Sequence, residues 1–129
     1  GNMDTLPITV DQMIYHARSV ARGVSRALVL CDMPFGSYQV CPDDAVRNAV
    51  RIMKESGADA LKLEGGIELV PTITRIINAG IPVCGHLGLT PQSVNVFGGY
   101  GLRAKDDAEA AKLIADAEAL DKAGVLELY

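Results

Sequence analysis

Four times along this chain, a helical pattern ends at a glycine and an apolar, strand-like run follows within a few residues. The four glycines are Gly23, Gly57, Gly80 and Gly124. Helices and strands that alternate in this way are joined by crossovers, which leave the strands parallel. The alternation therefore restricts the chain to the α/β class, with helices packed on a parallel sheet.

Two architectures satisfy this alternation, a doubly wound sheet and a (β/α)8 barrel. Neither a Gly-x-Gly-x-x-Gly run nor a Walker-type loop follows any strand, which weakens the nucleotide-binding, doubly wound version. Several strands end on polar residues, and barrel active sites collect at the carboxyl ends of the strands. We predict an α/β fold of the (β/α)8 TIM-barrel type. A full barrel takes about 250 residues, so residues 1–129 are predicted to form a single partial barrel domain.

The residue patterns also predict where the elements lie. Strands are expected at 27–31, 60–64, 81–86 and 125–129. Helices are expected after a capping box at Thr9–Gln12, from Pro42 to Gly57, from Ile67 to Ala79, and from Asp106 to Gly124. Residues 90–103 are expected to form a longer loop, with a short helix after Pro91 and mobile backbone at 98–101.

The composition excludes several classes of function. The net charge of -4 argues against nucleic acid as the main partner. No apolar run reaches the roughly 18 residues of a membrane span, and the N-terminus lacks a signal pattern. The cysteines Cys31, Cys41 and Cys84 are odd in number and lack Cys-x-x-Cys spacing, which favours a thiol-reduced, cytoplasmic setting. Cys31 and Cys84 lie in apolar runs and are expected to be small buried residues.

Charged or polar residues end three of the predicted strands. Asp32 ends the first, Lys62 and Glu64 lie two apart on the second, and His86 ends the third. Residues two apart on a strand point to the same face, so Lys62 and Glu64 share one face while Leu61 and Leu63 take the other. Parallel strands end at the same edge of a sheet, so we predict that these polar side chains converge.

The oxygen-rich donor set suggests a hard divalent cation such as Mg²⁺, held by carboxylates with water and substrate completing the shell. Lys62 could pair with a substrate carboxylate as a point charge. His86 could hydrogen-bond a keto or carboxylate oxygen. Such a site would stabilise an enolate formed next to a carbonyl. From these residues alone we predict metal-assisted chemistry on a small anionic substrate.

Structural explanations of the same residues stay open at this point. Asp32, before Met33-Pro34, could cap a turn. Lys62 and Glu64 could be a mutual structural pair. His86, between Gly85 and Leu87, could be a core histidine with all its hydrogen bonds made.

A longer stretch carries a family resemblance. Cys84-Gly85-His86-Leu87-Gly88-Leu89-Thr90-Pro91-Gln92-Ser93, continued by Val94-Asn95-Val96-Phe97-Gly98-Gly99-Tyr100, resembles the signature of ketopantoate hydroxymethyltransferase (3-methyl-2-oxobutanoate hydroxymethyltransferase). Three more segments match in order: Asp4 to Val10, Asp32 to Phe35, and Lys62 to Gly66. The resemblance spans nearly the whole chain and is more specific than any single short motif.

This resemblance implies a (β/α)8 barrel, a Mg²⁺-dependent enzyme and a homo-oligomer. The implied reaction transfers a hydroxymethyl group from 5,10-methylenetetrahydrofolate to 3-methyl-2-oxobutanoate, which gives ketopantoate on the route to pantothenate and coenzyme A. Asp32 matches a metal-binding aspartate that also lies against the substrate, and Glu64 matches the acidic residue at the metal site. Lys62 and His86 match substrate-contacting positions.

The chain also departs from the family pattern. The family has two more strands before the position of Gly1, and the second ends in a Gly-Asp-Ser run that supplies a further metal ligand and a substrate contact. Val125-Leu126-Glu127 has the letters of a later strand whose glutamate is the proposed base, but it follows Gly124 directly. Glu127 is either that glutamate after a deletion or a coincidence. We expect little or no turnover from the chain by itself, and self-association through exposed strand edges.

Two alternatives are carried beside the family activity. The first is a non-catalytic half-barrel, or degenerate interaction module, that keeps the core of the fold. The second is another Mg²⁺-dependent lyase acting on 2-oxo acids, which a comparison of 3-methyl-2-oxobutanoate with pyruvate would separate.

Overall fold

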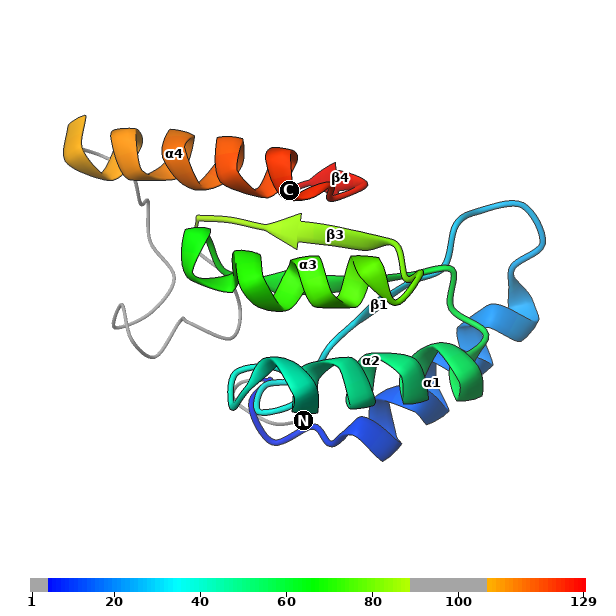
Figure 1. The fold of residues 1–129 in the computed structure, drawn as a ribbon. Helices are drawn as coiled ribbons and strands as arrows, with labels where there is room; N and C mark the ends of the chain where they lie inside the picture. Colours follow the sequence, from blue (N-terminus) through cyan, green and yellow to red (C-terminus); the bar gives the residue numbers. More distant parts are fainter. Residues whose placement is uncertain (1–4, 89–106) are drawn as a thin grey trace.

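Four parallel strands form one sheet in sequence order: β1 (Leu30–Asp32), β2 (Ala60–Glu64), β3 (Val83–His86) and β4 (Glu127–Leu128). The computed structural model describes residues 5–88 and 107–129. A helix precedes each strand (Figure 1): α1 (Val10–Gly23), α2 (Pro42–Ser56), α3 (Val70–Asn78) and α4 (Asp107–Ala123), with a short 3₁₀ helix, η1 (Ile67–Leu69), before α3. The loop and short helix predicted at 90–103 lie outside the described residues.

Neighbouring elements in the sequence are also neighbours in space. Each strand pairs with the next one, and α1 packs on α2, α2 on α3, and α3 on α4. A doubly wound sheet would instead reverse its strand order at a switch point. The sequential winding confirms the predicted α/β fold of the barrel type; the four strands described are half of the eight that close a barrel.

The two faces of the sheet differ in chemistry. Leu61 and Leu63 have no exposed surface and pack in the hydrophobic core with Cys31, Val83 and apolar side chains of the helices. Each fully buried leucine of this kind contributes about 1.5–3 kcal/mol. The alternate residues, Lys62 and Glu64, are not fully buried and lie outside this core. The strand pattern therefore assigns one face to folding and leaves the other for polar groups.

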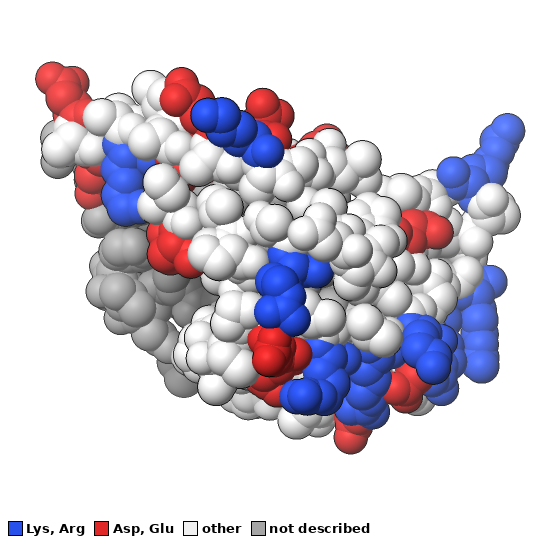
Figure 2. All heavy atoms as spheres, in the orientation of Figure 1, with Lys and Arg blue, Asp and Glu red and all other residues white. Residues whose placement is uncertain are grey.

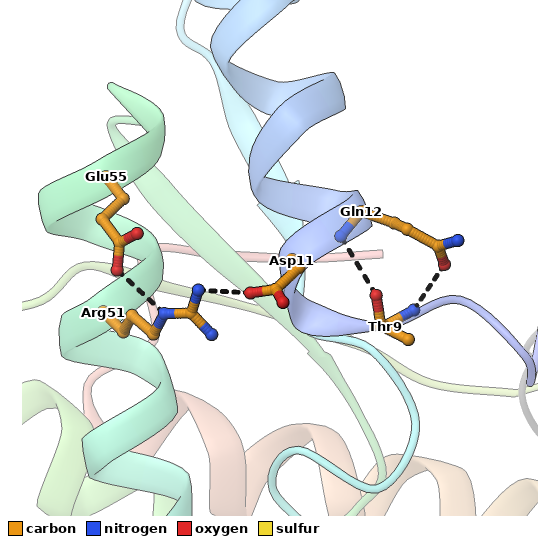
Figure 3. A network of polar contacts seen from close by, with 5 residues as sticks. All are labelled: Thr9, Asp11, Gln12, Arg51 and Glu55. Carbon is orange, nitrogen blue, oxygen red and sulfur yellow. Dashed lines mark hydrogen bonds and ion pairs between the residues drawn. The ribbon is translucent and has the colours of Figure 1, made fainter.

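Polar contacts at the start of α1 confirm the predicted capping box (Figure 3). The Thr9 hydroxyl accepts a hydrogen bond from the Gln12 N–H at 3.1 Å, and the Gln12 side-chain oxygen accepts one from the Thr9 N–H at 2.9 Å. Arg51 on α2 pairs with Asp11 on α1 and with Glu55 at 2.8 Å. These contacts fix the start of α1 and link it to the next helix.

Charged side chains of both signs lie on the outer surface of the helices. Lys and Arg side chains gather over the α1 and α2 side of the molecule, with Asp and Glu among them (Figure 2). A further pair, Arg75 to Asp43 at 2.8 Å, connects α3 with α2. Exposed pairs contribute about 0–1 kcal/mol each, so the apolar core dominates the packing of this layer. None of the helices within 5–88 and 107–129 is long and apolar enough to cross a membrane.

The first strand is shorter than predicted. It begins at Leu30 rather than at residue 27, and Leu28 is 58% exposed. The Val29 N–H donates to the Asp59 carboxylate at 2.8 Å, and the Val29 carbonyl accepts from the Asp59 N–H at 2.8 Å and from the Ala60 N–H at 3.4 Å. Regular pairing with β2 therefore starts only after this contact. The apolar run at 27–31 therefore begins before the segment that pairs regularly with β2.

Two helix predictions also needed correction. The helix predicted from Ile67 divides into η1 and α3, because Pro71 has no N–H to donate to the preceding turn. On α2, the helical spacing of Ala45, Val46, Ala49, Val50 and Met53 predicts an apolar face toward the core. Val50 is 38% exposed, however, whereas Ile52 is fully buried. Packing against α1 and α3 thus covers Ile52 and leaves Val50 at the edge of the apolar stripe.

The cysteine environments predict selective labelling. Burial raises the pKa of Cys31 to about 11, with a further contribution from Asp32, and burial also raises the pKa of Cys84. Cys41 is exposed. A thiol reagent at pH 8 should therefore modify Cys41 in the folded chain and all three cysteines after denaturation, as measured by mass spectrometry. Rapid labelling of a folded Cys41→Ser variant would contradict the described packing.

Candidate active site at the carboxyl ends of the strands

The register of the sheet brings the four predicted site residues to one face. Asp32 of β1 is paired with Lys62 of β2, and Glu64 of β2 is paired with His86 of β3. Residues paired across neighbouring strands, and residues two apart on one strand, point to the same face. The four side chains therefore form two adjacent rows on the face opposite Leu61 and Leu63. The predicted convergence is present in the structure.

The first row is an ion pair between neighbouring strands. Lys62 Nζ lies 3.0 Å from Asp32 Oδ1, and the two side chains are 20% and 47% exposed. The Asp32 carboxylate is thus paired with the ammonium group of Lys62. Partly exposed pairs of this kind add little stability.

The second row holds the Glu64 carboxylate and the His86 imidazole, which lie close together without a hydrogen bond between them. Glu64 Oε1 lies 3.8 Å from His86 Nδ1, which is longer than a hydrogen bond. The Glu64 side chain is only 7% exposed. His86 Nδ1 is buried and has no hydrogen-bond partner among the described residues. Buried polar atoms are usually paired, so His86 differs from a core histidine with all its hydrogen bonds made.

A buried aspartate that the sequence did not single out holds the turn after Glu64. Asp116 on α4 accepts the Ile67 N–H at 3.0 Å and pairs with Lys112 Nζ at 2.7 Å. Burial alone would raise the pKa of Asp116, but the bonds from Lys112 and Ile67 outweigh it and hold that pKa below its usual value. Asp116 packs directly against Gly66, where a Cβ would collide with the carboxylate. A side chain at residue 66 would therefore have to displace the Asp116 carboxylate.

Tyr38 is a second residue whose role the sequence did not reveal. It lies on the loop between β1 and α2, is 1% exposed, and its hydroxyl contacts the main chain of Glu64. No local pattern marks this contact, because the two residues are 26 positions apart.

Glu127 lies on the same face as the candidate site. In β4 it is paired with Cys84 of β3, which is in turn paired with Lys62. Its carboxylate is exposed and accepts a hydrogen bond from the Tyr129 hydroxyl at 3.0 Å. Glu127 therefore lies in the same row across the sheet as Asp32 and Lys62. This position does not by itself give Glu127 a chemical role.

The donor atoms at this site suit a divalent cation of the Mg²⁺ type. Within residues 5–88 and 107–129, no three His, Cys, Asp or Glu residues are grouped closely enough to hold a metal ion by themselves. Mg²⁺ is commonly held by one or two carboxylates, with water and substrate oxygens as the other ligands. The carboxylates of Asp32 and Glu64 on neighbouring strands fit that mode of binding.

Comparison with known proteins identifies the family. The family model described as ketopantoate hydroxymethyltransferase matches residues 1–129. The chain belongs to this family. Members of the ketopantoate hydroxymethyltransferase family align with this chain over almost all of its length.

Three curated relatives carry the name 3-methyl-2-oxobutanoate hydroxymethyltransferase. The protein of Bacteroides thetaiotaomicron is 66% identical over 124 residues, 96% of this chain and 45% of its own length. That of Bacteroides fragilis is 64% identical over 99% of this chain and 47% of its own. The Flavobacterium johnsoniae protein is 64% identical over 96% and 46%. The chain therefore spans about half the length of the curated relatives it matches.

The close packing of Gly66 against Asp116 makes a testable prediction. In a Gly66→Ala variant, the added Cβ should displace the Asp116 carboxylate and break its bonds to Ile67 and Lys112. We expect the free energy of unfolding to fall by about 2–4 kcal/mol, from steric overlap and a lost buried hydrogen bond. Denaturant unfolding followed by circular dichroism measures this change.

The matched control is Gly23→Ala. Gly23 ends α1, and a Cβ there would meet no atom within 4 Å. This variant should be as stable as the parent chain or slightly more stable. Equal stability of the two variants would show that Asp116 does not confine the turn.

Proposed function

We propose that this chain forms part of the active site of a 3-methyl-2-oxobutanoate hydroxymethyltransferase. The reaction would transfer a hydroxymethyl group from 5,10-methylenetetrahydrofolate to 3-methyl-2-oxobutanoate and give ketopantoate, on the route to pantothenate. The relatives' names support the substrate. The observation that carries the proposal is the register, which puts Asp32, Lys62, Glu64 and His86 on one face at the carboxyl ends of the strands.

Substrate binding is assigned to Asp32, Lys62 and His86. The Lys62 ammonium, held by Asp32 at 3.0 Å, is a point charge suited to the carboxylate of a 2-oxo acid. The buried Nδ1 of His86 has no partner among the described residues and would bond to a keto or carboxylate oxygen. Together these groups would orient the substrate with its branched carbon toward the one-carbon donor.

Charge balance favours a divalent cation at Asp32 and Glu64. The two carboxylates and the substrate carboxylate carry three negative charges when ionised, and Lys62 carries one positive charge. The difference is two negative charges, which one Mg²⁺ ion would neutralise. When bound, Mg²⁺ supplies a Lewis acid that favours the enolate form of the substrate.

The proposed chemical step is the addition of a substrate enolate to the one-carbon unit. A base would take the proton from the branched carbon, and the electron pair of that C–H bond would form the enolate. Water would hydrolyse both C–N bonds of the folate methylene bridge, which gives formaldehyde and leaves tetrahydrofolate with a proton on each nitrogen. The enolate carbon would then bond to the formaldehyde carbon, and the resulting alkoxide would take a proton to become the new hydroxyl group. The base is not assigned among the described residues. Lys62 and His86 would stabilise the charge that moves onto the substrate oxygens. Homo-oligomerisation and a cytoplasmic location stay predictions.

Substrate binding tests this proposal directly. The purified chain, titrated with 3-methyl-2-oxobutanoate in the presence of Mg²⁺, should show saturable binding by calorimetry. A Lys62→Met variant should bind about 10- to 100-fold more weakly, because a charge-assisted contact is lost. Chelation of Mg²⁺ should weaken binding in the same direction.

A Lys54→Met variant is the matched control, because Lys54 lies exposed in the last turn of α2. Its affinity should equal that of the parent chain. Equal affinities of the Lys62 and Lys54 variants would refute the assigned role of Lys62. Tighter binding of pyruvate than of 3-methyl-2-oxobutanoate would instead support a different 2-oxo acid enzyme.

A further inference from the structure

Tyr38 makes an unusual pair of hydrogen bonds with one residue of the candidate site. Its hydroxyl accepts a bond from the Glu64 N–H at 3.1 Å and donates one to the Glu64 carbonyl at 3.3 Å. Tyr38 belongs to no strand; it lies on the loop between β1 and α2 and is 1% exposed. A single buried phenol thus satisfies both main-chain polar groups of Glu64.

The course of β1 explains why these groups need a partner. Along β2, main-chain groups point alternately to the two neighbouring strands. The carbonyl of Lys62 points to β1, where it accepts the Met33 N–H at 3.0 Å, so the groups of Glu64 point the same way. At Pro34 the chain leaves the sheet and turns, with the Ser37 N–H bonded to the Pro34 carbonyl at 3.0 Å. The Tyr38 hydroxyl therefore takes the place of the next residue of β1.

The loop that carries Tyr38 is itself held by buried contacts. The Ser37 hydroxyl donates to the Pro34 carbonyl at 2.5 Å, and Asn48 on α2 donates to the Ser37 carbonyl at 2.8 Å. Ser37 is 4% exposed. The phenol is thus anchored through α2, and its hydroxyl has little freedom to follow a displaced Glu64.

We infer that Tyr38 is a positioning residue for the active site, acting through Glu64. It fixes the peptide groups on either side of the Glu64 Cα, and so the direction in which that carboxylate leaves the strand. It also connects the loop that follows Asp32 with the strand that carries Glu64. The relative placement of the two predicted metal-binding carboxylates therefore depends on Tyr38. The consequence for ligand binding rests on the proposed function; the effect on Glu64 does not.

A Tyr38→Phe variant tests the inference, since it keeps the ring and removes the hydroxyl. Hydrogen exchange of backbone amides, followed by NMR, should show the Glu64 amide exchanging about tenfold faster, while Leu61 and Leu63 on the same strand change much less. Affinity for 3-methyl-2-oxobutanoate with Mg²⁺ should fall about three- to tenfold as the carboxylate loses its fixed direction. Tyr15→Phe, at a tyrosine that is 68% exposed, should change neither measurement.

An Ile52→Val variant separates positioning from general loss of stability. Ile52 is fully buried on α2 and lies outside the candidate site. This variant should speed exchange broadly and leave ligand affinity unchanged. Equal acceleration of all β2 amides in Tyr38→Phe, or the same loss of affinity in Ile52→Val, would overturn the inference.

The exchange measurement needs no ligand, so it also separates the two proposals. If the parent chain binds no 2-oxo acid but the Glu64 amide responds selectively to Tyr38→Phe, the proposed function fails and the positioning of Glu64 by Tyr38 stands. If the Glu64 amide does not respond, the inference about Tyr38 fails, whatever the chain binds.

Discussion

The parallel register of β2 with β1 and β3 is the constraint on which the rest of the structure depends. It places Leu61 and Leu63 under the helices and leaves Lys62 and Glu64 on the opposite face. A shift of one residue would exchange these two sets and bury two charged groups in the apolar core, at a cost of several kcal/mol. The hydrophobic core thus fixes the register, and the register fixes the candidate site.

The polar face is supported from the loops as well as from the strands. Tyr38 bonds to the main chain of Glu64, and Asp116 bonds to the N–H of Ile67, three residues further on. These contacts come from the loop after β1 and from α4, the helix before β4. Glu64 is therefore held from both sides of its turn, in keeping with a site whose geometry must be fixed before a substrate binds.

Local patterns predicted much of this arrangement. The alternation in 60–64 gave the bounds of β2 and the faces of its residues, and Thr9–Gln12 gave the start of α1. The convergence of Asp32, Lys62, Glu64 and His86 followed from the parallel arrangement of strands. In each case the determining interactions lie within a few residues, or follow from the periodicity of regular strands.

Long-range contacts were not predictable in this way. The alternatives drawn from the sequence paired Lys62 with Glu64, but the structure pairs Lys62 with Asp32 on the neighbouring strand. The roles of Tyr38 and Asp116 rest on partners 26 and 49 residues away, which no local spacing encodes. The exposure of Leu28 depends on where regular β1–β2 pairing begins.

The central claim is that Asp32, Lys62, Glu64 and His86 act as one site for a 2-oxo acid and a divalent cation. A crystal structure of the chain with Mn²⁺ and 3-methyl-2-oxobutanoate tests it most directly, because Mn²⁺ can replace Mg²⁺ at oxygen ligands and is located by its anomalous scattering. The account predicts one anomalous peak between the Asp32 and Glu64 carboxylates, with the substrate carboxylate on Lys62. A peak away from these carboxylates, or substrate bound on the helical side of the sheet, would contradict it.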